Sequence, residues 1–407
     1  MKIQIAALTA VILLFAGCAV KEEKITPPKK EVTKKQPIQK STKKPSEAIT
    51  AAPTPEFFRA LDLSVGYYDR LSKKNTLFNY GDQNYTAAQM RDSLLLFKKY
   101  AASMDKEALL AKLDQDFLLY ESRNEKDSAL LTGYYAPVLK GSLTKSDEFY
   151  APLYPYPQDL ITADLKRFPT SNSVRDIAGK IEGKSLVPYY TREEIDNGAL
   201  KEKPLLYLSS KVDAFLLEVQ GSGIIEVDGV KRYVGYAGKN GHPYTSIGKV
   251  IADEKLMNSD KVNMQTMKEF LEENPKIRDY VLNKNKSYVF FKFNEKEGIF
   301  GNIGLSLTAK ESVAMDNELL PKGALAFIKT VVPKKIEGQK VVARTEREPF
   351  EKFVMVQDTG GAIRGGGRVD IYFGEGDEAL FYAGQTASKG EVYLLVAKKE
   401  SLNHITK

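Results

Sequence analysis

The stretch QDTGGAIRGGGRVDIYFGEGD, residues 357–377, places Asp358, Asp370 and Asp377 around a loop that is rich in glycine. The apolar run KFVMV leads into Asp358, and IYF follows Asp370. Short apolar runs bounded by glycine predict two β-strands joined by this loop. The glycines give the backbone freedom at positive φ, or they let a bulky ligand approach the main chain.

Similar short runs continue outward from this stretch, both towards the C-terminus and back to residue 130. They are cut by Gly, Pro and Asn-Gly, a spacing that is typical of β-barrels or sandwiches. One run that we interpret in this way is AFLLEVQGSGIIEV, residues 214–227. A helix-and-loop stretch near residues 246–285 separates the middle strands from the last group, which indicates a domain change close to residue 300.

Residues 56–130 have helical periodicity instead. Thr86 and Gln89 have the spacing of a capping box, and the apolar residues that follow lie on one helical face. A second helix is predicted to begin at Asp105 and to include Phe117 on its apolar face. The sequence therefore predicts a mainly β protein with N-terminal helices.

The N-terminus has the features of an export signal. Residues 1–18, MKIQIAALTAVILLFAGC, join one early charge to an apolar run and end on Cys18, the single cysteine. This pattern resembles the lipobox of bacterial lipoproteins, so we expect a lipid on Cys18. Residues 19–54 are rich in Lys and Pro and predict a disordered tether, because they offer little apolar surface to offset the entropy of ordering.

The charge of the chain points away from nucleic acid. The formal net charge is +7, and nine Lys against four Glu between residues 21 and 50 supply most of it. The folded body is therefore close to neutral, and we expect no nucleic-acid partner. The chain contains only His242, which we interpret as a turn residue, and His404 besides its one cysteine. We accordingly expect no zinc site, no other metal and no cofactor.

The aspartates are compatible with more than one kind of catalytic chemistry. Val-Met-Val-Gln-Asp358-Thr-Gly resembles the loop of aspartic peptidases, but a second such loop is missing, so that reading requires a homodimer. A glycoside-cleaving enzyme needs a protonated carboxyl group, and an Asp of ordinary pKa is protonated only about one part in a thousand at pH 7. Neighbouring carboxylates and burial beside Ile371, Tyr372 and Phe373 would both raise the pKa of Asp370.

Six blocks of the sequence, taken in order, resemble a known protein family. They are LLTGYYAPVLKGS (130–142), YYTREEIDNGAL (189–200), LEVQGSGIIEVDGVKRYVGYAGKNGHPYTSIGK (217–249), SYVFFKF (287–293), SLTAKESVAMD (306–316) and QDTGGAIRGGGRVDIYFGEGDEA (357–379). Together they resemble the membrane-bound lytic murein transglycosylase A family. The last block resembles the 3D domain, which is named for three aspartates.

The resemblance implies an architecture of two β-domains. Residues 55–154 and 301–400 would form a double-psi β-barrel with the N-terminal helices. Residues 155–300 would form a smaller inserted β-barrel domain. Glycan strands of peptidoglycan would lie between the two.

The resemblance also implies a reaction, the non-hydrolytic cleavage of the β-1,4 bond between N-acetylmuramic acid and N-acetylglucosamine. Asp370 would act first as acid and then as base, giving a 1,6-anhydromuramic acid product, with Asp358 and Asp377 in support. We expect other residues to edge the glycan groove, namely Gln220, Gly221, Ser222, Tyr134, Tyr135, Tyr236 and Tyr244.

The resemblance also implies a location. The protein would be a monomeric lipoprotein of the cell envelope, attached to the outer membrane and facing the periplasm. Its partners would be peptidoglycan and, through the lipid on Cys18, the membrane. A second functional class stays open from the residues alone, a wall-binding lipoprotein that keeps the groove without the chemistry.

Overall fold

The computed structural model describes residues 38–74, 76–124, 127–168, 176–258, 262–335, 345–361 and 363–403. The predicted signal peptide, with Cys18, and residues 19–37 of the predicted tether lie outside these ranges. Within them, no helix combines the length and the apolar character that a membrane crossing requires.

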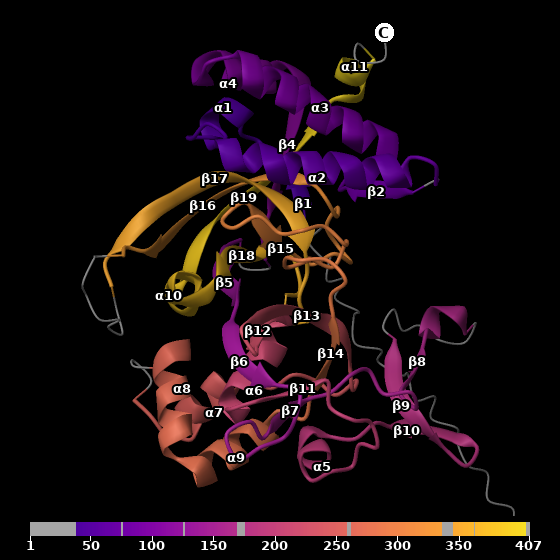
Figure 1. The fold of residues 1–407 in the computed structure, drawn as a ribbon. Coiled ribbons are helices and arrows are strands. Elements are labelled where there is room, and N and C mark those ends of the chain that lie inside the picture. The colour runs from indigo at the N-terminus through magenta and orange to yellow at the C-terminus, as the bar shows by residue number, and fades with distance from the viewer. Residues whose placement is uncertain are drawn as a thin grey trace, which may run out of the picture. The chain divides into compact units, whose positions relative to one another are not determined.

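Eight of the described strands form the larger sheet (Figure 1). In spatial order they are β1 (Ile38–Lys40), β4 (Phe117–Ser122), β19 (Ala387–Ala397), β16 (Leu325–Pro333), β17 (Arg347–Asp358), β15 (Ser312–Ala314), β18 (Arg368–Glu375) and β5 (Ala129–Ala136). Because β19 pairs with β5 as well as with β16, the last six of these strands form a nearly closed barrel. β5 runs parallel to β18, which lies more than 200 residues further along the chain.

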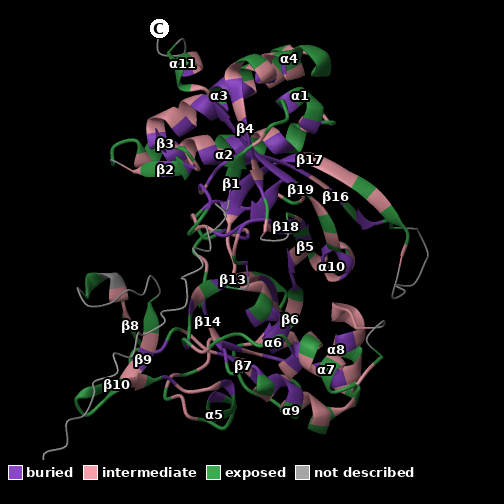
Figure 2. Ribbon diagram, turned by 180° about the vertical axis from the view of Figure 1, so that it is seen from behind, coloured by how far each residue is buried: buried purple, intermediate pink, exposed green. Residues whose placement is uncertain are grey.

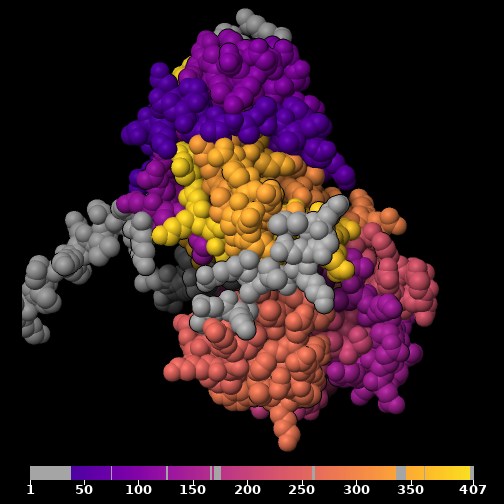
Figure 3. Space-filling model, turned by 90° about the vertical axis from the view of Figure 1, so that its left-hand side faces the viewer, coloured from indigo at the N-terminus to yellow at the C-terminus, as the bar shows by residue number. Residues whose placement is uncertain are grey.

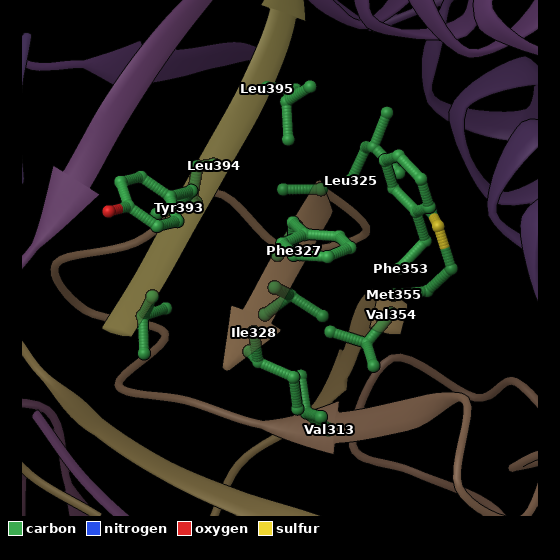
Figure 4. Close-up of a cluster of buried hydrophobic side chains, with 14 of the residues drawn as sticks. Val313, Leu325, Phe327, Ile328, Phe353, Val354, Met355, Tyr393, Leu394 and Leu395 are labelled. Carbon is green, nitrogen blue, oxygen red and sulfur yellow. The ribbon is translucent and has the colours of Figure 1, made fainter. Parts of the chain in front are cut away.

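Large apolar side chains from β16, β17 and β19 form a core with the helices that cover these strands (Figure 4). Phe327 and Phe353 pack edge to face with their ring centroids 5.0 Å apart, both are almost completely buried, and Phe353 also packs against Phe57 and Phe97 of the N-terminal helices. The strands read as continuous apolar runs because both of their faces are covered. This core fixes the strands that carry Asp358 and Asp370.

Helices from the N-terminal part of the chain cover the outside of these strands. Figure 3 shows them in indigo and purple over the orange and yellow strands of the barrel. They are α1 (Pro45–Ala48), α2 (Pro55–Leu71), α3 (Ala87–Ser103) and α4 (Lys106–Asp116), accompanied by a hairpin of β2 (Leu77–Tyr80) and β3 (Gln83–Thr86) and, near the C-terminus, by α11 (Lys399–Leu402). Helix α10 (Gly376–Gln385) lies apart from them and packs against β5 and β18 (Figure 1).

Both predicted helix starts are confirmed. Thr86 and Gln89 cap α3 reciprocally, and the Asp105 side chain accepts a hydrogen bond from the Ala108 amide at the start of α4. Phe117 is an exception, because the chain leaves the helix there and Phe117 begins β4. Its side chain is buried all the same.

A second sheet is formed by residues 138–293, which we call the inserted region. Its strands in spatial order are β14 (Val289–Phe293), β13 (Val230–Lys239), β12 (Ser222–Val227), β6 (Val138–Ser142), β11 (Leu206–Leu208) and β7 (Ala151–Leu153). One parallel bridge, Pro155 to Phe291, brings its two edges together. The helices of this region are α5 (Arg192–Asp196), α6 (Lys211–Gln220), α7 (Ile247–Asp253), α8 (Met264–Glu273) and α9 (Pro275–Lys284).

A third, smaller sheet projects from the inserted region and exposes many of its residues (Figure 2). It contains β8 (Ile161–Ala163), β9 (Ile177–Glu182) and β10 (Ser185–Pro188), with a 3-10 turn at Leu165–Arg167.

One predicted strand is wrong in its first half. Residues 214–220 belong to helix α6, which is capped by Ser210 and ends at Gly221 with φ of 81°. Five apolar residues and Glu218 are buried in this short helix, so its apolar residues do not follow the one-sided periodicity that marks an amphipathic helix. Only the second half of the run forms a strand, β12.

Two predicted boundaries also need correction. β6 and β7 already belong to the second sheet, so the inserted region begins between Ala136 and Val138 and not at residue 155. The tether prediction is wrong for residues 38–54, which include strand β1 and helix α1. Ile38 and Ile49 are almost fully buried there, because β4 and α4, distant in sequence, supply the apolar partners that local composition does not reveal.

Candidate active site

Sheet register places Asp358 and Asp370 on one face of the barrel. Ala314 of β15 pairs with Asp358 of β17 on one side and with Asp370 of β18 on the other. Thr132 of β5 continues the same row as the partner of Asp370. Side chains of directly opposed residues point to the same face, and two strand spacings put the two aspartate Cα atoms roughly 10 Å apart. The small side chain of Ala314 leaves the space between the carboxyl groups unfilled by a large residue.

Asp370 is partly buried and is held from β5. Its Oδ1 accepts a hydrogen bond from the Thr132 hydroxyl, and Thr132 Oγ1 in turn accepts one from Arg368 Nη1 at 2.7 Å. Burial raises the pKa of Asp370 above its usual value, whereas the hydrogen bond from Thr132 and the charge of Arg368 act to lower this pKa. Burial is the largest of these effects, so the pKa of Asp370 is raised on balance.

Asp358 is fixed by three hydrogen bonds. Its Oδ2 accepts from the Tyr134 hydroxyl at 2.8 Å, and its Oδ1 accepts from the amides of Asn302 at 2.9 Å and Thr359 at 2.8 Å. Burial raises the pKa of Asp358 to about 6, although these hydrogen bonds act to lower it. The negative charge of Asp370 also raises this pKa, as the last of the effects that act on Asp358.

Tyr134 joins the two aspartates to the inserted region. Thr132 and Tyr134 are two residues apart on β5 and therefore point to the same face. The Tyr134 ring packs against Tyr372 with centroids 5.3 Å apart, within a buried cluster to which Ile224 of β12 contributes. Tyr134 thus donates a hydrogen bond to Asp358 while its ring is engaged in packing.

Asp377 lies apart from the other two aspartates. It is exposed in the first turn of α10, where its charge raises the pKa of Tyr135, an effect that comes after those of burial and Asp213. The structure therefore brings together Asp358 and Asp370, and it places Asp377 beside Tyr135.

The glycine-rich loop is shaped by its own backbone. Gly365 has φ of 86°, and its amide donates to Asp316 Oδ2 at 2.8 Å. Gly367 has φ of 65°, and a Cβ there would lie 2.6 Å from the Ser128 carbonyl oxygen. These two glycines are required by the turn itself, whereas Gly361 has open space around it. Clearance for a ligand remains a prediction for that position.

The other predicted site residues lie in the inserted region. Gln220 Oε1 accepts a hydrogen bond from the Tyr135 amide at 3.0 Å, which ties the end of α6 to β5. Gly221 ends α6 and Ser222 begins β12. Tyr236 and Tyr244 are about half exposed, at 51% and 45%. Of this set, Gln220 is the one whose contact to β5 is seen directly.

Three participants were not singled out from the sequence, Thr132, Arg368 and Asn302. Thr132 is two residues before Tyr134, and Arg368 is two residues before Asp370, so strand alternation around the chosen residues would have indicated both. Asn302 contributes only its backbone amide, for which the sequence carries no signal. Over the described ranges, no three His, Cys, Asp or Glu side chains gather closely enough to hold a metal ion.

The raised pKa of Asp358 predicts a pH-dependent stability. In the folded state this pKa is about 6, against a usual value of 3.8, so between these pH values the folded chain binds more protons than the unfolded chain. The free energy of unfolding should then fall by up to about 3 kcal/mol as pH rises from about 4 to above 6. Asp358→Asn should not show this loss. The melting temperature of the variant minus that of the wild type should therefore increase as pH rises through that range.

Leu77→Ala, at a residue that is 62% exposed at the start of β2, supplies the baseline for this comparison. A difference between Asp358→Asn and wild type that stays constant from pH 4 to pH 7 would refute the assignment of the raised pKa to Asp358.

Comparison with known proteins gives consistent matches. The family model described as the MltA specific insert domain matches residues 130–292, and that of the 3D domain matches residues 311–396. Membrane-bound lytic murein transglycosylase A of Escherichia coli K12 is 32% identical over 280 residues, which span 68% of this chain and 67% of that relative. The protein of the same name from Vibrio cholerae is 30% identical over 278 residues, 67% of this chain and 66% of its own length.

Solved structures of proteins with these names are also similar to this chain. The crystal structure of Escherichia coli MltA with bound chitohexaose has a TM-score of 0.64 at 26% identity, covering 89% of this chain and 95% of that one. A membrane-bound lytic murein transglycosylase from Agrobacterium tumefaciens has a TM-score of 0.70 at 23% identity, covering 90% of this chain and 99% of that one. The Agrobacterium structure supports the fold.

Proposed function

Because this chain belongs to the membrane-bound lytic murein transglycosylase A family, and is therefore an enzyme of lytic peptidoglycan cleavage, we propose that Asp370 carries out both proton transfers of its reaction. The substrate bond would be the β-1,4 bond between N-acetylmuramic acid and N-acetylglucosamine. The product would end in 1,6-anhydromuramic acid.

The steps balance without water. Asp370 donates its proton to the glycosidic oxygen as the bond to the muramic acid anomeric carbon breaks. The resulting Asp370 carboxylate then takes the proton of the muramic acid 6-hydroxyl, whose oxygen closes onto the anomeric carbon. The substrate supplies the nucleophile, so one carboxyl group suffices, and Asp370 ends protonated and ready for the next turnover.

The observation that carries this proposal is the environment of Asp370. An acid catalyst must be protonated at working pH, and burial on the barrel face raises the pKa of Asp370. Asp358 lies on the same face with its own raised pKa, and charge repulsion between two carboxylates disfavours ionisation of both. In this proposal Asp370 is the acid, and Asp358 is a rigid neighbour whose negative charge would add to the effect of burial.

Substrate contacts are proposed for the residues around this face. Gln220, Gly221 and Ser222 offer amide and hydroxyl groups beside β5, and Tyr134, Tyr135, Tyr236 and Tyr244 remain candidates for contact with sugar rings. The chitohexaose in the related Escherichia coli structure supports glycan binding by this fold. We attribute to Asp377 a supporting role through Tyr135, whose pKa it affects.

The setting follows from the family and from the N-terminal sequence. We infer a lipid on Cys18 and attachment to the outer membrane on its periplasmic side, with the protein acting as a monomer. The six-stranded barrel is consistent with a double-psi topology, with the inserted region as the second domain of the enzyme. Family membership favours glycan cleavage over the peptidase alternative.

Product analysis tests the reaction. Purified peptidoglycan is digested with the wild-type chain, and the soluble fragments are examined by mass spectrometry. We expect products that are lighter by one water molecule than the hydrolysed fragments and that lack a reducing end. Fragments with free reducing ends would show hydrolysis and overturn the proposal, and the absence of any fragment would favour a wall-binding protein without catalysis.

Thr132 should set the pH profile as a positioning residue. Its hydroxyl donates to Asp370 and so stabilises the carboxylate form, and Thr132→Val removes this donor. A hydrogen bond to a charged group contributes about 1.5–3 kcal/mol, so the alkaline limb of kcat/KM should move up by about one to two pH units. Thr132→Ser keeps the hydroxyl and should keep the wild-type profile. A lower rate at every pH without movement of the limb would contradict this role.

A further inference from the structure

A pocket of about 450 Å³ lies within the inserted region, separate from the face that carries Asp358 and Asp370. Its lining comes from β7, α5, β11, α6 and α9, which Figure 1 shows at the lower end of the molecule. None of the residues discussed above as candidates for catalysis or glycan binding lines it.

The floor of the pocket is a buried ion pair whose two charged groups are hydrogen-bonded. Arg192 and Glu218 are 3% and 7% exposed, and they form a bidentate pair with distances of 2.9 and 2.7 Å. Arg192 also donates to the carbonyl oxygens of Asn285 and Ser287, and the Val289 amide donates to Glu218. The floor is therefore neutral overall and rigid, which leaves recognition to the walls.

The walls carry polar groups that no described residue satisfies by a hydrogen bond. They are the hydroxyl groups of Tyr150, Tyr154 and Tyr207, the carboxylate of Asp196 and the ammonium group of Lys145. Asp196 interacts electrostatically with Arg192 and Lys211, and burial raises its pKa. Aromatic rings together with convergent polar groups are a common form of ligand site.

The charged groups in the walls of the pocket indicate which class of ligand it would bind. A neutral N-acetyl sugar would cover Lys145 without a counter-charge and would leave Asp196 with only the electrostatic attraction of Arg192 and Lys211, which costs free energy. A peptide that bears an ammonium group and a carboxylate would compensate both charges, and its amides would pair with the tyrosine hydroxyls. We propose that this pocket binds the peptide stem of peptidoglycan, with the stem ammonium at Asp196 and a stem carboxylate at Lys145.

The position of α6 makes this geometry possible. Lys211 at its start lines the pocket, and Gln220 at its end bonds to Tyr135, the neighbour of Tyr134. The rise along these ten residues is about 14 Å. An extended peptide of four residues spans a similar length, about 13–14 Å. A stem attached to a sugar near the barrel face can therefore reach towards the pocket, so the inference rests on the proposed glycan substrate.

Paired substrates test the proposal. Glycan strands with their stems are compared with the same strands after an amidase has removed the stems. Asp196→Asn should raise KM about tenfold for stem-bearing strands, leave kcat unchanged, and have no effect on stripped strands. Asp253→Asn, a surface change on α7 outside the pocket, should match wild type on both substrates. An equal effect of Asp196→Asn on both substrates, or none on either, would overturn the proposal.

A binding measurement separates this inference from the proposed reaction. Calorimetric titration of the full chain with a synthetic stem tetrapeptide that bears a free side-chain ammonium and a C-terminal carboxylate requires no catalysis. Binding that Asp196→Asn weakens about tenfold supports the pocket even if no 1,6-anhydro product is found. Failure of the wild-type chain to bind the peptide overturns the pocket even if that product forms.

Discussion

Replacing Asp370 by Asn should lower kcat on peptidoglycan by about three orders of magnitude. Asn has nearly the same size as a protonated Asp, but it can neither give a proton to the glycosidic oxygen nor take one from the 6-hydroxyl group. Both proposed steps would fail together. The change is measured as the release of soluble fragments from purified peptidoglycan, with mass spectrometry to count 1,6-anhydro ends.

The control for this variant must separate chemistry from folding. Thr132 still meets an oxygen or nitrogen at position 370, so Asp370→Asn should keep a melting temperature within a few degrees of wild type. Asp253→Asn, on the surface of α7, should keep full activity. Activity of Asp370→Asn within tenfold of wild type would show that another group is the acid, and Asp358 would be the next residue to test.

Replacing Arg192 by Met should give the largest loss of stability. The guanidinium group makes four hydrogen bonds in a buried site, two of them to Glu218. Without it, Glu218 keeps a buried charge that has no counter-charge. Breaking a buried ion pair by removal of one partner costs about 3–5 kcal/mol. Denaturant unfolding followed by circular dichroism would measure this loss, since the chain has no Trp for fluorescence.

The double variant Arg192→Met with Glu218→Leu is the matched control. It removes both charges and so should recover part of the lost free energy, although the Asn285 carbonyl group and the Val289 amide still lose their partners and the Ser287 carbonyl group keeps only Asn285 Nδ2. A double variant that is less stable than Arg192→Met by the full cost of a second change would mean that the charge of Glu218 is compensated in another way.

Some features of the fold could be predicted because their causes are local. The caps at Thr86 and Asp105 were found from the sequence, since a cap depends on residues three positions apart. Helix α6 was missed because its apolar residues do not follow a one-sided periodicity. The order in residues 38–54 was missed because Ile38 acquires its neighbours from β4, about 80 residues away.

For the candidate site, the sequence by itself determined that Asp358 ends one strand, that Asp370 lies in the next, and that apolar residues follow Asp370 in the family's pattern. Only the tertiary structure decided which aspartates lie together. Ala314 aligns Asp358 with Asp370, while Asp377 lies in the first turn of α10, where its charge affects the pKa of Tyr135. The Thr132 hydroxyl reaches Asp370 across 238 positions of sequence. A hydrogen bond of that range depends on the parallel pairing of β5 with β18, and closure of the barrel, which no local pattern encodes, creates that pairing.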